Sequence, residues 1–136
     1  MTTATITITG KTWDEARDGE VDAQHAIAQA KFTTEWTGDM TGTSTCWLLI
    51  SYVAGAADKP ETLEGPYIGY EQVDATVDGR RGTFVLAASG EHTGAVARTR
   101  VTIVAGSGTG ELEGITGSGS YAADAMQYTL TLDYEL

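Results

Sequence analysis

One carboxylate, Glu71, lies where an acidic side chain could carry out proton-transfer chemistry. It belongs to an alternating stretch in which Tyr67, Gly69, Val73 and Ala75 fall on the same face of an extended chain. Because that face is otherwise apolar, we expect it to look into the protein interior. A carboxyl group in a dry interior has a raised pKa and can serve as a general acid or base.

Two other interpretations of Glu71 stay open. Its side chain could lie near the mouth of the interior and reach water, or it could pair with Arg98 or Arg100. Buried charges in proteins are usually paired for structural reasons, so a carboxylate on an apolar face does not by itself indicate catalysis.

Aromatic side chains would complete a site around this carboxylate. Tyr67 and Tyr128 fall on interior positions, and their hydroxyls could donate hydrogen bonds that orient a ligand oxygen. Further side chains are candidates for the wall of an apolar ligand cavity: Phe32, Trp36, Trp47, Phe84, Met126 and Tyr134. Packing in a filled core explains the same aromatic side chains equally well.

The remaining motifs do not support other kinds of active site. The GSGTG segment at 106–110 lacks the Lys-Ser/Thr of a phosphate-binding loop and predicts a turn. His25 and His92 show no ligand-like spacing with Cys46 and no serine partner, so neither a zinc site nor a hydrolase triad is expected. We therefore predict no metal and no cofactor, and Cys46 is expected to be an inert buried thiol.

The charge balance narrows the choice of partners. The chain has 8 basic and 19 acidic residues, for a net charge of −11. Such a surface repels phosphate backbones and anionic lipids, so neither nucleic acid nor a membrane is an expected partner. No apolar run reaches the roughly 18 residues of a membrane helix, and the N-terminus lacks a signal-peptide pattern. The expected location is the cytoplasm.

The elements that would position these residues are strands. Strands are predicted over residues 3–11, 25–36, 43–53, 67–77, 81–89, 95–103, 111–121 and 126–135. Apolar and polar side chains alternate in most of them, but 111–121 is glycine-rich and 43–53 is nearly all apolar from Cys46 onward, which predicts a strand buried on both faces or one whose outer face meets a partner. The alanines of 25–36 would also suit a helix, but alternation favours a strand there. The charged stretch 14–24 predicts a loop, and Asp78-Gly79 predicts a tight hairpin.

Eight strands joined by short links predict an all-β protein, and 136 residues fit a single domain, 1–136. Eight antiparallel strands can stack as a sandwich or close as a barrel. The last strand alternates strongly and could pair with the first, which would remove the exposed edges. We expect a closed antiparallel β-barrel, whose interior would be filled by side chains or would hold one small ligand.

Several phrases of the chain resemble a known family. They are YIGYEQVDATVDGRRGTFVLAASG at 67–90, GSGTGELEGITGSGSY at 106–121 and the ending YTLTLDYEL, with KTWDE at 11–15 and FTTEWTGDMTGTST at 32–45. Together they resemble the bacterial domain-of-unknown-function family 3224, which is similar in fold to the allene oxide cyclase barrel. The resemblance implies a barrel rather than a sandwich, and it carries no assigned function.

The resemblance also bears on single residues. Glu71 stands where the family commonly has a glutamate in a G-x-E-like phrase. Family members often carry a glutamate near Trp47 and a polar residue or histidine near Ala87 or Ala88, where this chain is apolar. That departure implies a drier interior, which suits an apolar ligand.

Three functions follow as hypotheses. The favoured one is a cofactor-free isomerase or cyclase acting on an apolar polyene, polyketide-like or lipid-like compound, with Glu71 as acid or base. The second is a barrel that binds an apolar small molecule without chemistry. The third is a filled-core interaction protein that forms a homo-oligomer through the apolar segment 48–53. A cavity of roughly 300 Å³ or more beside Glu71 would favour the first two.

Overall fold

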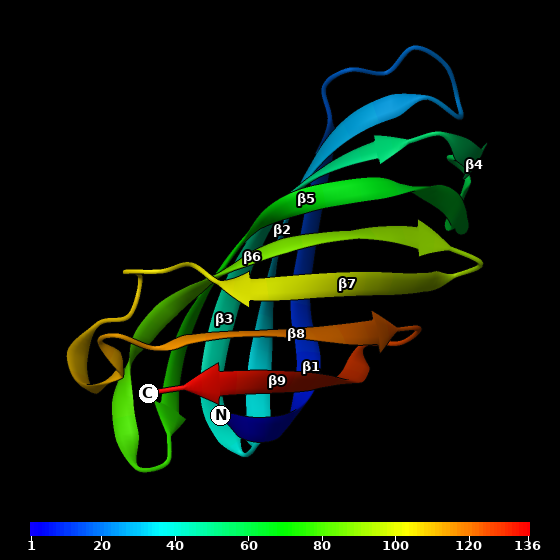
Figure 1. Cartoon of the computed structure of the whole chain (residues 1–136). Coiled ribbons are helices and arrows are strands. Elements are labelled where there is room, and N and C mark those ends of the chain that lie inside the picture. The colour runs from blue at the N-terminus through cyan, green and yellow to red at the C-terminus, as the bar shows by residue number, and fades with distance from the viewer.

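Threonine and branched apolar side chains alternate along most of the chain, and the backbone follows them as extended strands. The computed structural model describes residues 1–136 (Figure 1). Its strands are β1 (Thr2–Arg17), β2 (Ala26–Gly38), β3 (Met40–Tyr52), β4 (Ala54–Ala56), β5 (Lys59–Val77), β6 (Arg80–Thr93), β7 (Val96–Ile103), β8 (Thr116–Ala123) and β9 (Gln127–Glu135), and a single 3₁₀ turn, η1 (Gly110–Leu112), precedes β8.

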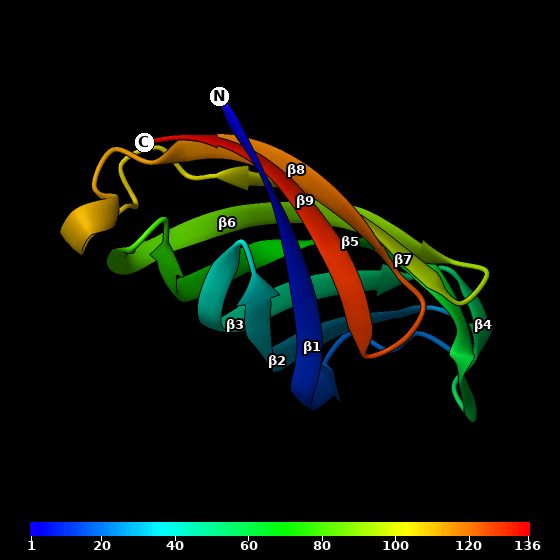
Figure 2. The same cartoon turned by 90° about the horizontal axis from the view of Figure 1, so that it is seen from below.

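The strands close into a barrel. β1 pairs antiparallel with both β2 and β9, and β3 pairs antiparallel with β5, so the ring runs β1-β2-β3-β5-β6-β7-β8-β9 and returns to β1. The short β4 pairs only with β5 and lies outside this ring. Figure 2 shows β1 and β9 side by side where the first and last strands meet. The predicted closed antiparallel barrel of about eight strands is confirmed.

The predicted end of the first strand is wrong. β1 continues to Arg17 through residues that were predicted to form a loop, with a register shift between Gly10 and Thr12. Beyond that shift Thr12 and Thr33 join their hydroxyls at 2.6 Å, and the Trp13 ring stacks on Phe32. These contacts with β2 hold the charged segment extended.

The predicted strand at 111–121 is also corrected, because β8 begins only at Thr116. The preceding segment turns instead, with left-handed φ angles of 60° at Gly110 and 85° at Gly114. This loop is tied to β6 by the Thr109 backbone N–H, which donates to the Thr83 carbonyl at 2.8 Å. It thereby carries the fully buried Leu112 and Ile115 into one end of the barrel.

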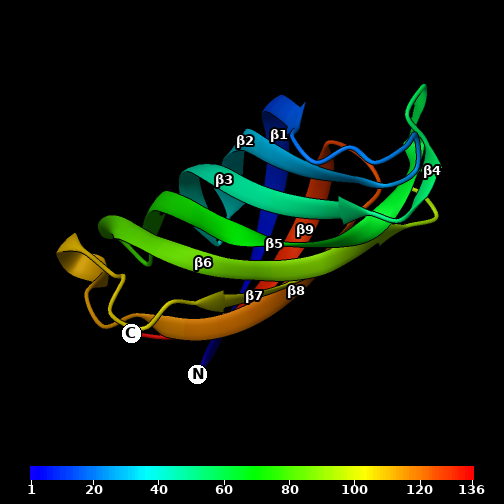
Figure 3. The ribbon, with the colours of Figure 1, turned by 90° about the horizontal axis from the view of Figure 1, so that it is seen from above.

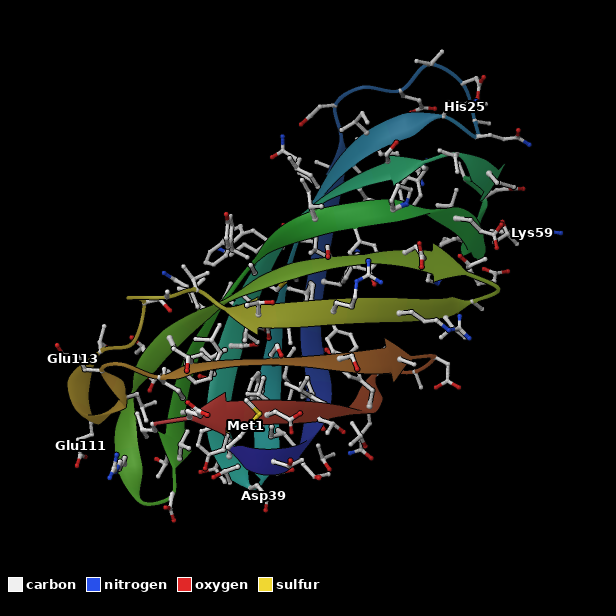
Figure 4. All side chains as sticks on the ribbon, in the orientation of Figure 1. Met1, His25, Asp39, Lys59, Glu111 and Glu113 are labelled. Carbon is white, nitrogen blue, oxygen red and sulfur yellow. The ribbon has the colours of Figure 1, made fainter.

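The interior of that end is filled, and we call it the closed half. Its core residues are Ala4, Ile6, Ile8, Trp36, Met40, Val73, Ala75, Val77, Phe84, Leu86, Ala88, Val101, Ile103, Leu112, Ile115, Leu130 and Leu132. Figure 4 shows Glu111 and Glu113 pointing into solvent from the loop that covers this end.

A second buried cluster occupies the opposite end, which we call the open half. Its members are Ala26, Ala28, Ala30, Phe32, Cys46, Leu48, Ile50, Tyr52, Leu63 and Tyr67. The loop before β2 and the hairpin that starts β5 lie at this end, where Figure 4 labels His25 and Lys59. Figure 3 shows the curved walls of β2, β3, β5 and β6 that join the two halves. The 3₁₀ turn falls short of the length and hydropathy of a membrane-crossing helix.

Candidate functional site

A cavity of about 680 Å³ occupies the open half of the barrel. Small side chains leave this space, because inward positions of β7 and β8 carry Ala97 and Ala123. Leu48 and Ile50 of β3 and Leu63 of β5 line the opposite wall. The lining is mostly apolar and the volume is that of a small-molecule site.

Tyrosines form much of the polar surface of the cavity. Tyr67 and Tyr128, both predicted site residues, line it together with Tyr121. The Tyr67 hydroxyl bonds Thr99 Oγ1 at 2.6 Å, and the rings of Tyr121 and Tyr128 lie 4.7 Å apart. Burial raises the pKa of all three hydroxyls, so they stay protonated and able to donate at neutral pH.

Glu71 lies inside the barrel, with only 3% of its surface exposed. Its partner is not Arg98 or Arg100, which are exposed on β7, so the ion-pair alternative is wrong. Instead Ser44 Oγ donates to Glu71 Oε2 at 2.5 Å. Burial raises the pKa of the carboxyl to about 6, although the Ser44 hydrogen bond acts in the opposite direction.

A chain of hydrogen bonds joins Glu71 to the cavity. Thr34 and Ser44 join their hydroxyls at 2.5 Å, and the Trp36 indole N–H donates to Thr34 Oγ1 at 3.1 Å. Because Ser44 donates its proton to Glu71, Thr34 must donate to Ser44. Thr34 lines the cavity whereas Glu71 itself does not. The carboxylate therefore reaches the cavity only through two hydroxyls.

Sequence reasoning missed Thr34 and Ser44. Both sit on inward positions of strands whose alternation was recognised, so a polar side chain at an inward position was the available signal. A single threonine or serine at an inward position is small enough to be an ordinary residue of a packed core. Only the register that pairs Thr34 with Ser44 brings them together.

The predicted cavity residues divide between the two halves. Phe32 and Met126 line the cavity, Met126 from the exposed turn before β9. Trp36 and Phe84 instead pack edge to face, 6.3 Å apart, in the closed half. Tyr134 packs against the same core. These three residues are not part of the cavity wall.

The prediction for Trp47 is wrong. Cys46 and Leu48 face inward on β3, and strand geometry therefore turns Trp47 to the outside, where 43% of it is exposed. The uninterrupted apolar run from Cys46 onward concealed the alternation. The Lys31 ammonium lies 5.7 Å from the Trp47 ring on this outer surface.

The mouth of the cavity carries polar groups from the extended end of β1. Tyr52 donates its hydroxyl to Glu15, with oxygen distances of 3.1 and 3.0 Å. The Arg17 guanidinium lies 5.2 Å above the Tyr52 ring and 3.8 Å from Glu15. Trp13 is half exposed and lines this mouth. An apolar cavity thus opens through a charged rim.

His92 also lines the cavity, and its tautomer follows from its partner. Its Nδ1 lies 2.5 Å from the Leu63 carbonyl oxygen, which can only accept. Nδ1 therefore carries the proton. No group of three or more His, Cys, Asp or Glu side chains is arranged to hold a metal ion.

Comparison with known families identifies the chain. The sequence profile of a family described as "Protein of unknown function (DUF3224)" matches residues 3–134. The chain belongs to the DUF3224 family.

The structural comparison agrees with this assignment. The DUF3224 barrel is similar to the crystal structure of a protein of unknown function of the same family from Shewanella oneidensis MR-1. The TM-score is 0.73 at 22% identity, over 100% of this chain and 98% of that one. No curated protein matches the chain. The likeness to the allene oxide cyclase barrel stays a prediction.

Proposed function

We propose that this DUF3224 barrel binds an apolar small molecule in its open half and isomerises or cyclises it without a cofactor. The observation that carries the proposal is the apolar cavity of about 680 Å³, well above the roughly 300 Å³ of a small ligand site. Polyene, polyketide-like or lipid-like compounds suit such a lining. The enclosed wall would keep water from a reactive intermediate.

Glu71 would supply the acid or base in this reaction. A carboxyl with a pKa of about 6 is populated in both protonation states near neutral pH. A proton would pass from the ligand to Thr34 as Thr34 gives its own proton to Ser44 and Ser44 gives its own to Glu71, which is the direction in which these hydroxyls donate. Protonated Glu71 would return a proton by the reverse route. Tyr67 and Tyr128 would orient a ligand oxygen.

One observation favours a second candidate, a binding barrel without chemistry. Glu71 does not line the cavity, and its hydrogen bond to Ser44 is one that a purely structural carboxyl could also make. In that case the cavity would only carry its ligand. The two candidates differ in what happens to a bound compound.

The test uses a panel of epoxide-bearing polyenes. Tryptophan fluorescence measures binding, and chromatography with mass spectrometry detects conversion as a product of unchanged mass and altered retention time. Glu71→Gln keeps the shape of the side chain and should abolish conversion while leaving binding nearly intact. Glu91→Gln, on the exposed outer side of β6, is the matched control. Unchanged turnover in Glu71→Gln would exclude the acid–base role, and binding of these polyenes without conversion would favour the carrier.

The hydroxyl chain has its own test. Thr34→Val removes the group that would touch the ligand but keeps the volume, whereas Thr34→Ser keeps the hydroxyl. Conversion should be lost in the first variant and retained in the second. Equal conversion in both would show that the proton takes another route.

A further inference from the structure

The outer surface of β2, β3 and β5 carries large apolar side chains. Trp47 lies opposite Tyr70 in the strand register, and Leu49 lies opposite Ile68. Directly opposed residues on one face of a sheet are in contact distance. Leu49 is 50% exposed and Ile68 is 61% exposed, so these four side chains form one continuous apolar patch open to solvent.

The outward side chains immediately around this patch on β2, β3, β5, β6 and β7 include no carboxylate. Residues that lie opposite one another on neighbouring strands form rows across the sheet, and the patch lies within three successive rows of outward side chains. These rows are Thr33, Thr45, Gln72 and Val85; Lys31, Trp47, Tyr70, Ala87 and Thr102; Gln29, Leu49, Ile68, Ser89 and Arg100. None of them is acidic, although the chain has 19 acidic residues. Acids return in the rows on either side, with Glu35 and Asp74 on one flank and Glu91 on the other. They also return at the β1 edge, where Asp14 lies opposite Lys31 and Asp18 accepts a hydrogen bond from Gln29. We call these three rows the neutral face.

We propose that the neutral face binds a second copy of this chain, forming a two-fold dimer. Two molecules of charge −11 repel each other, and repulsion is smallest where neither presents a carboxylate. The neutral face meets that condition over three rows, and its basic residues Lys31 and Arg100 stand at its edges. In a two-fold dimer the same face serves both partners, so one carboxylate-free patch is sufficient.

The residue types agree with this assignment. Trp and Tyr are enriched in the buried cores of protein interfaces, where acids and Lys are depleted. The strands involved are paired on both sides within the closed barrel, so association would occur through side chains and not by strand addition. The patch lies on the barrel wall, whereas Trp13 and Met126 line the cavity mouth, so the dimer would leave both cavities accessible.

Sedimentation velocity of the full chain, from micromolar to submillimolar concentration, tests the proposal. We expect the wild-type protein to approach twice the monomer mass, and added salt to tighten the dimer by screening the remaining charge. Leu49→Glu should weaken association by at least about tenfold, because a carboxylate would be buried against an apolar partner. Val21→Glu places the same charge at a residue that is 85% exposed and outside the neutral face, and should leave the dimer intact.

Ile68→Asn is a second, milder variant in case Leu49→Glu loses its native circular dichroism. A folded Ile68→Asn protein that is monomeric supports the proposal. A wild-type protein that stays monomeric throughout overturns it, as does a dimer that both variants leave unchanged. A trimeric mass excludes the two-fold arrangement. Because no ligand is involved, these outcomes are independent of the proposed function.

Discussion

The two halves of the barrel are built from the same strands and differ in what those strands carry inside. β2 places Trp36 in the closed half but Ala28 and Ala30 in the open half. β7 likewise places Ile103 in the closed half, whereas Ala97 lines the cavity. On β2 and β7, therefore, the smaller inward side chains lie at the end where the lumen stays unfilled.

The loop around η1 adds a second difference. It covers only the closed half, where Leu112 and Ile115 plug the barrel. No comparable plug enters the open half, whose mouth is lined by Glu15, Arg17 and Tyr52. The packed core and the cavity thus lie at opposite ends of one sheet.

The largest effect on stability is expected when one phenylalanine in each half is replaced by alanine, and the size of the effect should differ between the halves. Phe84→Ala leaves a void in the filled core and should cost about 3–5 kcal/mol of unfolding free energy. Phe32→Ala enlarges a space that already exists, so only the transfer term of roughly 1.5–3 kcal/mol is lost. Denaturant titration of both variants measures these losses of unfolding free energy. Equal costs would contradict the distinction between a filled and an open half.

Enlarging an alanine in each half should give the converse result. Ala88→Leu overpacks the closed half and should cost about 1–3 kcal/mol. Ala97→Leu grows into the cavity, so its stability should stay within about 1 kcal/mol of wild type. Binding of a neutral polyene probe, followed by fluorescence, should weaken only in Ala97→Leu. Retained binding there would place the ligand elsewhere.

The sequence predicted whether a side chain points into the barrel better than it predicted where along the barrel that side chain lies. Alternation identified the inward side of β9 and the inward position of Glu71, since period two follows directly from strand geometry. Alternation does not tell how far along the barrel a side chain lies. Trp36 and Phe84 were therefore predicted beside the ligand although they belong to the closed half.

The other wrong predictions arose from the residues immediately around each position in the sequence. Trp47 was assigned to the interior because a continuous apolar run hides which residues face in. The rim residues Glu15 and Arg17 were left in a loop because charged side chains at the end of a strand resemble a linker, and only the pairing with β2 shows otherwise. The contacts that correct both predictions join residues far apart in the chain.

Glu71 lies between the halves, and its titration gives the next prediction. The folded pKa of about 6 exceeds the ordinary 4.5, so the native state binds the proton more tightly than the unfolded chain. The resulting stabilisation is complete below pH 4.5 and is lost as the pH rises through 6. Glu71→Gln does not titrate. Its stability relative to wild type should therefore rise by up to about 2 kcal/mol between acid and neutral pH.

Urea unfolding of both proteins at several pH values checks this difference. Glu91→Gln, an exposed carboxylate on β6, provides the background for losing a charge alone. A relative stability that does not change with pH would mean that Glu71 is no harder to ionise in the fold than in the unfolded chain.

The smallest expected effect concerns the hydroxyl that joins Glu71 to the open half. Ser44 donates to the carboxylate and holds its pKa below the value that burial alone would give. Ser44→Ala should therefore raise the pKa of Glu71 further, as seen by ¹³C NMR of the carboxyl carbon. Thr34→Val removes a donor to Ser44 and should act in the same direction but more weakly, because Thr34 reaches the carboxylate only through Ser44. Ser51→Ala, an outward serine on the same strand, should change nothing. If Thr34→Val leaves the pKa of Glu71 unchanged while Ser44→Ala raises it, Thr34 is not coupled to the carboxyl, and Glu71 belongs with the packed core rather than with the cavity.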